Sequence, residues 1–205
     1  MDACPPKRGP GRPRSFDEAT ALDAAMRCFW AQGYARASIE DLSREMQMPR
    51  TSLYATYGDK DGLFLAAIAH YVETRSGTAI AHLTGQGDAV AEVSAFLSAM
   101  IDMVTPDPAT PGCLIACVLS EAATAHPSFK AALAARTDGL EHRLYASVHA
   151  ASPMESKDDL HAKAGLLAAT ARGISVSARA GVDAGTLRKT AEMAVRLTCA
   201  RAQTC

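Results

Sequence analysis

Apolar residues recur every three or four positions over long stretches of this chain, and that period predicts α-helices. The first stretch runs from about Ser15 to Gly33, with Ser15 and Glu18 at the spacing of a capping box. Its apolar face consists of Leu22, Ala25, Met26, Phe29 and Trp30. We expect Phe29 and Trp30 to be core residues rather than platforms for nucleic-acid bases. No stretch alternates as a strand would, so the chain is expected to be all-α.

Two short helices joined by a tight turn are predicted between Ser38 and Lys60. Ser38 can cap the first, and Pro49 suits the start of the second. In the second helix, Leu53 and Tyr57 hold the helix down, and the polar residues face outward: Arg50, Thr51, Ser52, Tyr54 and Thr56. Hydrogen-bonding side chains gathered at the beginning of a short second helix are typical of the recognition helix of a helix-turn-helix. The pattern predicts binding to double-stranded DNA.

The residues from Phe16 to Phe64 resemble the DNA-binding domain of the TetR/AcrR family of transcriptional regulators. The resemblance rests on Phe29-Trp30, Gln32-Gly33-Tyr34, Ser38, Leu53-Tyr54, Tyr57-Gly58 and Lys60-Asp61-Gly62-Leu63-Phe64. It implies an all-helical homodimer that binds an operator and releases it when an inducer binds. It also implies that Lys60 approaches a phosphate. Two symmetric recognition helices would require a near-palindromic operator.

A basic arm precedes the predicted helices. Lys7, Arg8, Arg12 and Arg14 lie together with no acid between them, in a segment rich in glycine and proline, although the whole chain has a net charge of -1. Such arms insert arginines into A·T-rich minor grooves, and the alternative is a solvated tail. The expected DNA contacts are Arg12, Arg14, Ser38, Arg50, Thr51, Ser52, Tyr54, Tyr57 and Lys60.

The rest of the chain reads as further helices. Breaks are predicted at 84–88, 105–112, 126–128, 151–156 and 181–185, where glycine, proline and small polar residues gather. We therefore expect a flexible basic arm (1–14), a three-helix helix-turn-helix DNA-binding domain (15–60) and a six-helix ligand-binding and dimerisation domain (61–205).

A seam of mostly small apolar residues marks the helix before residue 180. It consists of Leu160, Ala164, Leu167, Ala171, Ile174 and Ala178. Alternating spacings of four and three favour helix pairing, so the seam is expected at the dimer interface, where this helix and the one at about 184–201 would form a four-helix bundle with their symmetry mates. The same spacing also serves a packing face within one protomer.

Candidate ligand-binding residues lie in the middle of the chain. Cys113 and Cys117 are four residues apart and would share a helix face with Glu121. Buried cysteines acting as small hydrophobes, redox or electrophile sensing, and metal binding are all open, and a helix N-terminus would favour Cys113 as the reactive thiol. The Gly-Cys-Leu opening at 112–114 also resembles a subset of the family in which a cysteine here senses electrophiles or oxidants. The expected pocket residues are Phe96, Met100, Met103, Cys113, Cys117 and Phe129.

Several classes of protein are disfavoured by what the sequence lacks. No apolar run is long enough to cross a bilayer, and the N-terminus has no apolar core of a secretion signal, so a cytoplasmic protein with reduced cysteines is expected. No cofactor or metal motif is recognised, and no nucleophile elbow or phosphate-binding glycine loop suggests an enzyme. The favoured function is a repressor released by a small-molecule, electrophile or oxidant inducer, mainly apolar in character. The alternatives are a helical thiol-dependent enzyme and a ligand-independent DNA-architectural protein.

Overall fold

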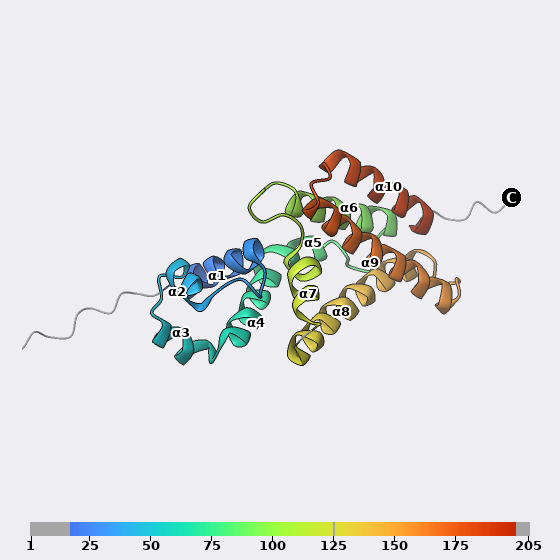
Figure 1. Ribbon diagram of the computed structural model, residues 1–205. Helices are drawn as coiled ribbons and strands as arrows, with labels where there is room; N and C mark the ends of the chain where they lie inside the picture. Colours follow the sequence, from blue (N-terminus) through green and yellow to red (C-terminus); the bar gives the residue numbers. More distant parts are fainter. Residues whose placement is uncertain (1–16, 125, 200–205) are drawn as a thin grey trace, which may run out of the picture.

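The computed structural model describes residues 17–124 and 126–199, which form helices joined by turns and loops, with no strands. At one end lie α1 (Glu18–Gln32), α2 (Ile39–Glu45) and α3 (Arg50–Tyr57), and α10 (Ala184–Cys199) lies at the other (Figure 1). The all-α prediction is confirmed. Arg12 and Arg14 lie outside the described residues.

The first three helices begin and end at residues whose chemistry explains the boundaries. Asp17, not Ser15, caps α1, because its side chain accepts a hydrogen bond from the backbone N–H of Ala19. Gly33 ends α1 at a φ of 80°, where a side chain would be strained. The turn between α2 and α3 passes through Gln47 at a φ of 51°, a left-handed conformation that the sequence reading did not anticipate.

The remaining helices follow the predicted breaks. In the described part of the chain they form six continuous helical stretches. The first joins α4 (Lys60–Tyr71), a π-helical segment η1 (Val72–Ser76) and α5 (Gly77–Ile80). It is followed by α6 (Ala89–Val104), by a second π-helical segment η2 (Leu114–Leu119) that continues into α7 (Ser120–Ala122), and by α8 (Pro127–Ala151), α9 (Lys157–Arg179) and α10.

Two clusters of buried residues hold the chain together. The first combines α1 to α4 with Leu114, Val118 and Phe129, so residues far along the chain complete the core around the helix-turn-helix. The second joins α6, α8, α9 and α10. Met103 and Cys113 pack against both clusters. The two cores therefore meet at the end of α6 and the start of η2.

The seam on α9 is buried inside one protomer. All six of its residues are 7% exposed or less and belong to the second cluster, so their expected place at the dimer interface is wrong. The seam packs intramolecularly because α6, α8 and α10 of the same chain already cover it. Large apolar side chains that remain exposed on other positions of α9 and α10 are Leu166, Val176, Met193 and Leu197.

Candidate nucleic-acid interface and ligand cavity

The beginning of α3 presents a polar surface. Arg50, Thr51 and Ser52 are exposed, and Tyr54 is 47% exposed one residue after the fully buried Leu53. An Arg50 guanidinium nitrogen lies 2.6 Å from a carboxylate oxygen of Glu40 on α2. This surface ion pair is open to solvent on both sides and can exchange its partner for a phosphate or a base edge at little cost. The geometry fits a recognition helix.

Ser38 and Tyr57 were also expected to contact DNA, but their hydroxyl groups are not part of the exposed polar surface of α3. The Ser38 hydroxyl caps α2, accepting from the Asp41 N–H at 3.0 Å and donating to the Asp41 carboxylate at 2.6 Å, a bond that lowers the pKa of Asp41. The Tyr57 hydroxyl is buried and has no hydrogen-bond partner among the described residues, and burial raises the pKa of Tyr57. In this conformation Tyr57 packs inward, whereas Tyr54 faces outward.

Lys60 lies at the first position of α4, directly after its capping residue Asp59. Its ammonium is 4.5 Å from the centre of the Tyr34 ring and donates to the backbone oxygen of Ala35 at 3.4 Å. Burial lowers the pKa of Lys60. The charge is thus held beside the N-terminus of a helix, where backbone N–H groups also favour an anion.

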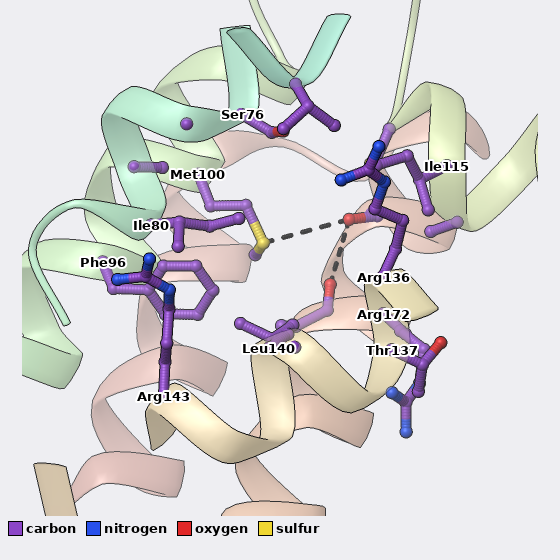
Figure 2. Close-up of a pocket in the computed structure, with 18 of the residues that line it drawn as sticks. Ser76, Ile80, Phe96, Met100, Ile115, Arg136, Thr137, Leu140, Arg143 and Arg172 are labelled. Carbon is purple, nitrogen blue, oxygen red and sulfur yellow. Dashed lines mark hydrogen bonds between the residues drawn. The ribbon is translucent and has the colours of Figure 1, made fainter. Parts of the chain in front are cut away.

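A cavity of about 520 Å³ lies between η1, α5, α6, η2, α8 and α9 (Figure 2). Four of the six expected pocket residues line it, namely Phe96, Met100, Met103 and Cys113. Both π-helical segments contribute to its wall, through Val72 and Ser76 on one side and Ile115 and Ala116 on the other. Such segments are frequent at functional sites.

Cys117 and Phe129, the other two expected pocket residues, do not line the cavity. Cys117 lies in η2, whereas Cys113 precedes η2 with an extended backbone (φ -102°, ψ 131°), so the α-helical period does not relate the directions of the two side chains. Burial raises the pKa of the Cys117 thiol, which disfavours a reactive thiolate. The thiol that faces the cavity is Cys113, to which the Tyr71 hydroxyl donates at 3.3 Å.

Phe129 belongs to an aromatic cluster at the start of α8. Its ring centre lies 4.9 Å from that of Tyr34, 5.0 Å from that of Phe64 and 4.7 Å from that of His126. His126 lies 3.3 Å from the carboxylate of Asp61, which also accepts a hydrogen bond from the Tyr34 hydroxyl. Phe129 therefore attaches α8 to the helix-turn-helix core, next to Lys60.

The sequence reading missed the arginines of the cavity. Arg136 and Arg143 on α8 and Arg172 on α9 line it, and none of the described residues that line it is acidic. Arg136, Leu140 and Arg143 follow the spacing i, i+4, i+7, so they share one face of α8. That spacing is the one signal in the sequence for these arginines, because it places two charged residues on the same helix face as an apolar one.

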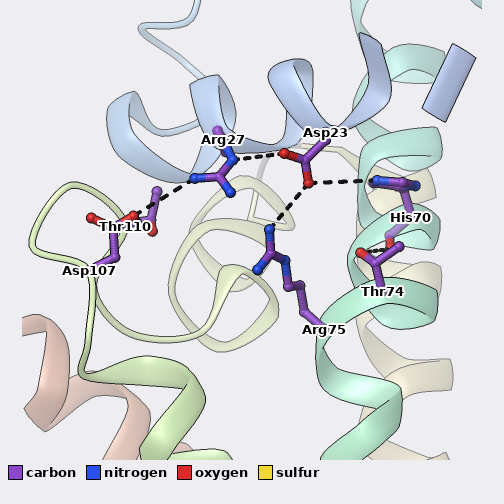
Figure 3. Close-up of polar contacts among 7 residues, drawn as sticks. All are labelled: Asp23, Arg27, His70, Thr74, Arg75, Asp107 and Thr110. Atoms are coloured by element: carbon purple, nitrogen blue, oxygen red, sulfur yellow. Dashed lines mark hydrogen bonds and ion pairs between the residues drawn. The ribbon is translucent and has the colours of Figure 1, made fainter. Parts of the chain in front are cut away.

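Side chains of α1 tie the helix-turn-helix to the cavity wall (Figure 3). Asp23 accepts from Arg27 at 2.8 Å and from Arg75 of η1 at 3.3 Å. Arg27 in turn lies 4.0 Å from Asp107 in the loop after α6. A second link passes through Tyr71, whose ring meets that of Trp30 at 5.0 Å while its hydroxyl contacts Cys113.

Gly112 in the loop before η2 should be intolerant of a side chain. Its φ is 77°, and an added Cβ would meet the backbone oxygen of Ser175 at 2.7 Å. We expect Gly112→Ala to cost about 2 kcal/mol or more, since strain in the left-handed region adds to a collision with backbone. Gly181→Ala is the control, because Gly181 has a φ of 89° but nothing within 4 Å. Equal losses in urea unfolding would contradict the predicted collision.

Comparison with known proteins agrees with this geometry. A family model for bacterial regulatory proteins, tetR family, matches residues 21–67. The HTH-type transcriptional repressor ComR of Escherichia coli (strain K12) is 40% identical over 67 residues, 33% of this chain and 32% of ComR. A regulator from Bacillus subtilis (strain 168), YezE, is 38% identical over 77 residues, 38% of this chain and 40% of YezE. These matches span only about a third of the curated relatives.

Solved structures extend the likeness over the whole fold. A cysteine mutant of the TetR-family regulator CifR, complexed with a 26-bp double-strand operator DNA, is 32% identical with a TM-score of 0.79. The match covers 90% of this chain and 98% of CifR. A TetR regulator from Chloroflexus aurantiacus J-10-FL shares the fold at 22% identity and a TM-score of 0.75, over 89% of this chain and 94% of that one. None of the described helices is both long and apolar enough to cross a membrane.

Proposed function

Because the chain belongs to the TetR family of transcriptional regulators, we propose that it is a homodimeric repressor that releases its operator when a small molecule occupies the cavity. Operator binding is supported by the exposed polar start of α3 and by the likeness to CifR, which was solved on operator DNA. Arg50, Thr51, Ser52 and Tyr54 are the proposed contacts, with Lys60 at a phosphate and the arm residues Arg12 and Arg14 in the minor groove.

One observation carries the regulatory part of the proposal. The unbroken stretch α4–η1–α5 begins at Lys60, the proposed phosphate contact, and ends in Ala79 and Ile80, which line the cavity together with Val72 and Ser76. A ligand that fits one position of η1 better than another therefore changes the position of α4 and of the helix-turn-helix. The size of the response is set by the ligand's difference in affinity between the two states.

A second route connects the same two places. The middle of α8 lines the cavity through Leu133, Arg136 and Leu140, and the start of α8 holds Phe129 against Tyr34 and Phe64. If ligand binding shifts α8, His126 moves with it and changes its contact with Asp61, the neighbour of Lys60. The ligand thus acts on the DNA-binding helices from two sides.

Dimerisation is proposed through the outer faces of α9 and α10. Leu166, Val176, Met193 and Leu197 expose between 48% and 70% of their surface there, which is costly unless a partner covers them. Pairing of these faces about a two-fold axis would hold two α3 helices at a fixed separation, so the operator should be a near-palindrome.

The inducer is either a small molecule that binds reversibly or a compound that reacts with a thiol, and the two need different parts of the cavity. A reversible small molecule needs only the cavity, which is mainly apolar. An electrophile or oxidant would need Cys113, the thiol that lines the cavity, rather than Cys117, whose raised pKa keeps it protonated. Treating the protein with a thiol-alkylating reagent before measuring operator affinity separates these cases.

Binding to the DNA upstream of the protein's own gene tests the proposed function. At about 0.15 M salt, we expect selective binding over unrelated DNA with a symmetric footprint. Arg50→Gln should weaken it by roughly tenfold or more, because a lost arginine contact to DNA costs about 1–3 kcal/mol.

The control for Arg50→Gln is Lys157→Gln, which removes one positive charge at the start of α9, far from α3 (Figure 1). It should leave operator affinity nearly unchanged. Equal effects of the two substitutions, or binding no tighter than to unrelated DNA across the gene's flanks, would contradict the proposed interface.

A further inference from the structure

Positively charged side chains gather in the cavity, although the chain as a whole carries a slight negative charge. Within the part of the chain that the structure describes, the cavity lining contains three arginines and no aspartate or glutamate, whereas the net charge of the whole protein is -1. Most of the remaining wall is apolar, with Phe96, Met100 and Leu140 facing the space (Figure 2). A purely apolar ligand would cover these charges without offering them a hydrogen-bond acceptor, which costs free energy.

Two of the three arginines have no acidic partner within the described residues. Arg172 is paired, with a guanidinium nitrogen 3.5 Å from the carboxylate of Glu141. Arg136 and Arg143 form no ion pair with any described residue. Figure 2 draws the guanidinium of Arg136 on the side of Ile115 and that of Arg143 on the side of Phe96. Both are therefore available to an anion at the edge of an apolar space.

Ser76 gives an independent indication of a polar ligand group. Ser76 is only 7% exposed and lines the cavity, and its hydroxyl has no hydrogen-bond partner among the described residues. A buried hydroxyl without a partner costs free energy that a ligand acceptor would recover. Ser175, another serine of the wall, differs, because it donates to the backbone oxygen of Ala171 at 3.0 Å.

We propose that the cavity takes an amphipathic anion, with its apolar body against Phe96, Met100 and Leu140 and its anionic head group paired with one of the two arginines that lack an acidic partner, Arg136 or Arg143. The Ser76 hydroxyl donates to the same ligand. The inference rests on the proposed function, since it names the chemical class of the regulator's ligand. A carboxylate, sulfonate or phosphate monoester satisfies the same donors, because arginine pairs with each through parallel N–H···O bonds.

A pair of fluorescent dyes tests this inference. Anilinonaphthalenesulfonate and N-phenylnaphthylamine share the same ring system, and only the first carries an anionic group. For the purified full-length protein, we expect Arg136→Gln/Arg143→Gln to weaken binding of the sulfonate dye by about tenfold or more and that of the neutral dye by less than about threefold. Ser76→Ala should weaken binding of the sulfonate dye by roughly threefold and leave binding of the neutral dye unchanged.

Lys130→Gln is the control for the loss of positive charge from α8 outside the cavity. Lys130 is exposed on the same helix and does not line the cavity, so its loss lowers the net charge without touching the site. Retained binding of the neutral dye shows that each variant keeps its cavity. Displacement of the sulfonate dye by decanoate, but not by decyltrimethylammonium, is expected for the wild-type protein.

The outcomes separate the ligand class from the function. Equal weakening of both dyes in the double arginine variant, or equal effects of that variant and Lys130→Gln, overturns the anionic class. Selective operator binding alongside such a result leaves the proposed function standing. Absence of selective operator binding by the wild-type protein overturns the proposed function, whatever the dyes show.

Discussion

Glu92→Gln is expected to lower the free energy of unfolding by about 3 kcal/mol at neutral pH. Glu92 lies on α6, is 9% exposed, and organises the loop before its own helix. Its carboxylate accepts from the backbone N–H groups of Thr84 at 3.1 Å, Gly85 at 2.9 Å and Gly87 at 2.9 Å, and from the Ser147 hydroxyl of α8 at 2.6 Å. A neutral amide would keep one acceptor oxygen and bring N–H groups toward donors.

The same carboxylate predicts how stability depends on pH. Burial disfavours its charge, but the bonds from Ser147, Thr84 and the loop outweigh burial and lower the pKa of Glu92 from 4.5 to about 2. A depressed folded-state pKa means that the stabilisation is complete above the unfolded pKa and is lost as pH falls through the range between the two. The difference in the free energy of unfolding between the wild-type protein and Glu92→Gln should therefore decrease as the pH falls from about 5 to about 2.

Urea unfolding at one protein concentration measures both effects, since association of protomers also contributes to stability. Glu141→Gln is the control, because Glu141 makes a half-exposed pair with Arg172 that should contribute less than about 1 kcal/mol. A difference between wild type and Glu92→Gln that stayed constant down to pH 3 would show that the charge of Glu92 is not what holds the loop.

The helix-turn-helix could be predicted from the sequence because local rules decide it. Ser38 caps α2, and Gly33 and Gly58 end α1 and α3. The breaks between later helices were predictable for the same reason, since each contains glycine, proline or small polar residues. The predicted start of α1 was wrong, because both Ser15 and Asp17 are residue types that cap helices and the sequence alone does not rank them.

The cavity could be predicted only in part, because its walls come from helices that meet through tertiary packing. Phe96, Met100, Met103 and Cys113 were found by their apolar or reactive character. The α-helical period did not apply to the pair of cysteines, because Cys113 precedes η2 with an extended backbone. On the α9 seam, spacing alone could not show that helices of the same protomer cover it. Polar lining residues such as Arg136 look like ordinary solvated positions until the opposite wall is known.

Phe129→Ala is expected to lower the free energy of unfolding by about 3–5 kcal/mol, the range for truncating a fully buried phenylalanine. Phe129 is 0% exposed and meets the rings of Tyr34, Phe64 and His126 edge-on or tilted. Each such aromatic pair contributes about 0.5–1.5 kcal/mol beyond the buried area. Truncation would leave a void between α8 and the helix-turn-helix core, so operator affinity should fall as well.

Phe96→Ala is the informative comparison, because Phe96 is almost as deeply buried, at 2% exposed, but borders the cavity. A side chain that faces open space on one side makes fewer contacts, so its removal should cost less than the loss of Phe129. Urea unfolding of the two variants measures the difference, and Phe129→Leu, which keeps apolar volume but loses the aromatic contacts, should fall between wild type and Phe129→Ala. A loss for Phe96→Ala equal to or larger than that for Phe129→Ala would mean that the aromatic cluster does not fasten α8 to the DNA-binding helices, and the second route from cavity to operator would lose its basis.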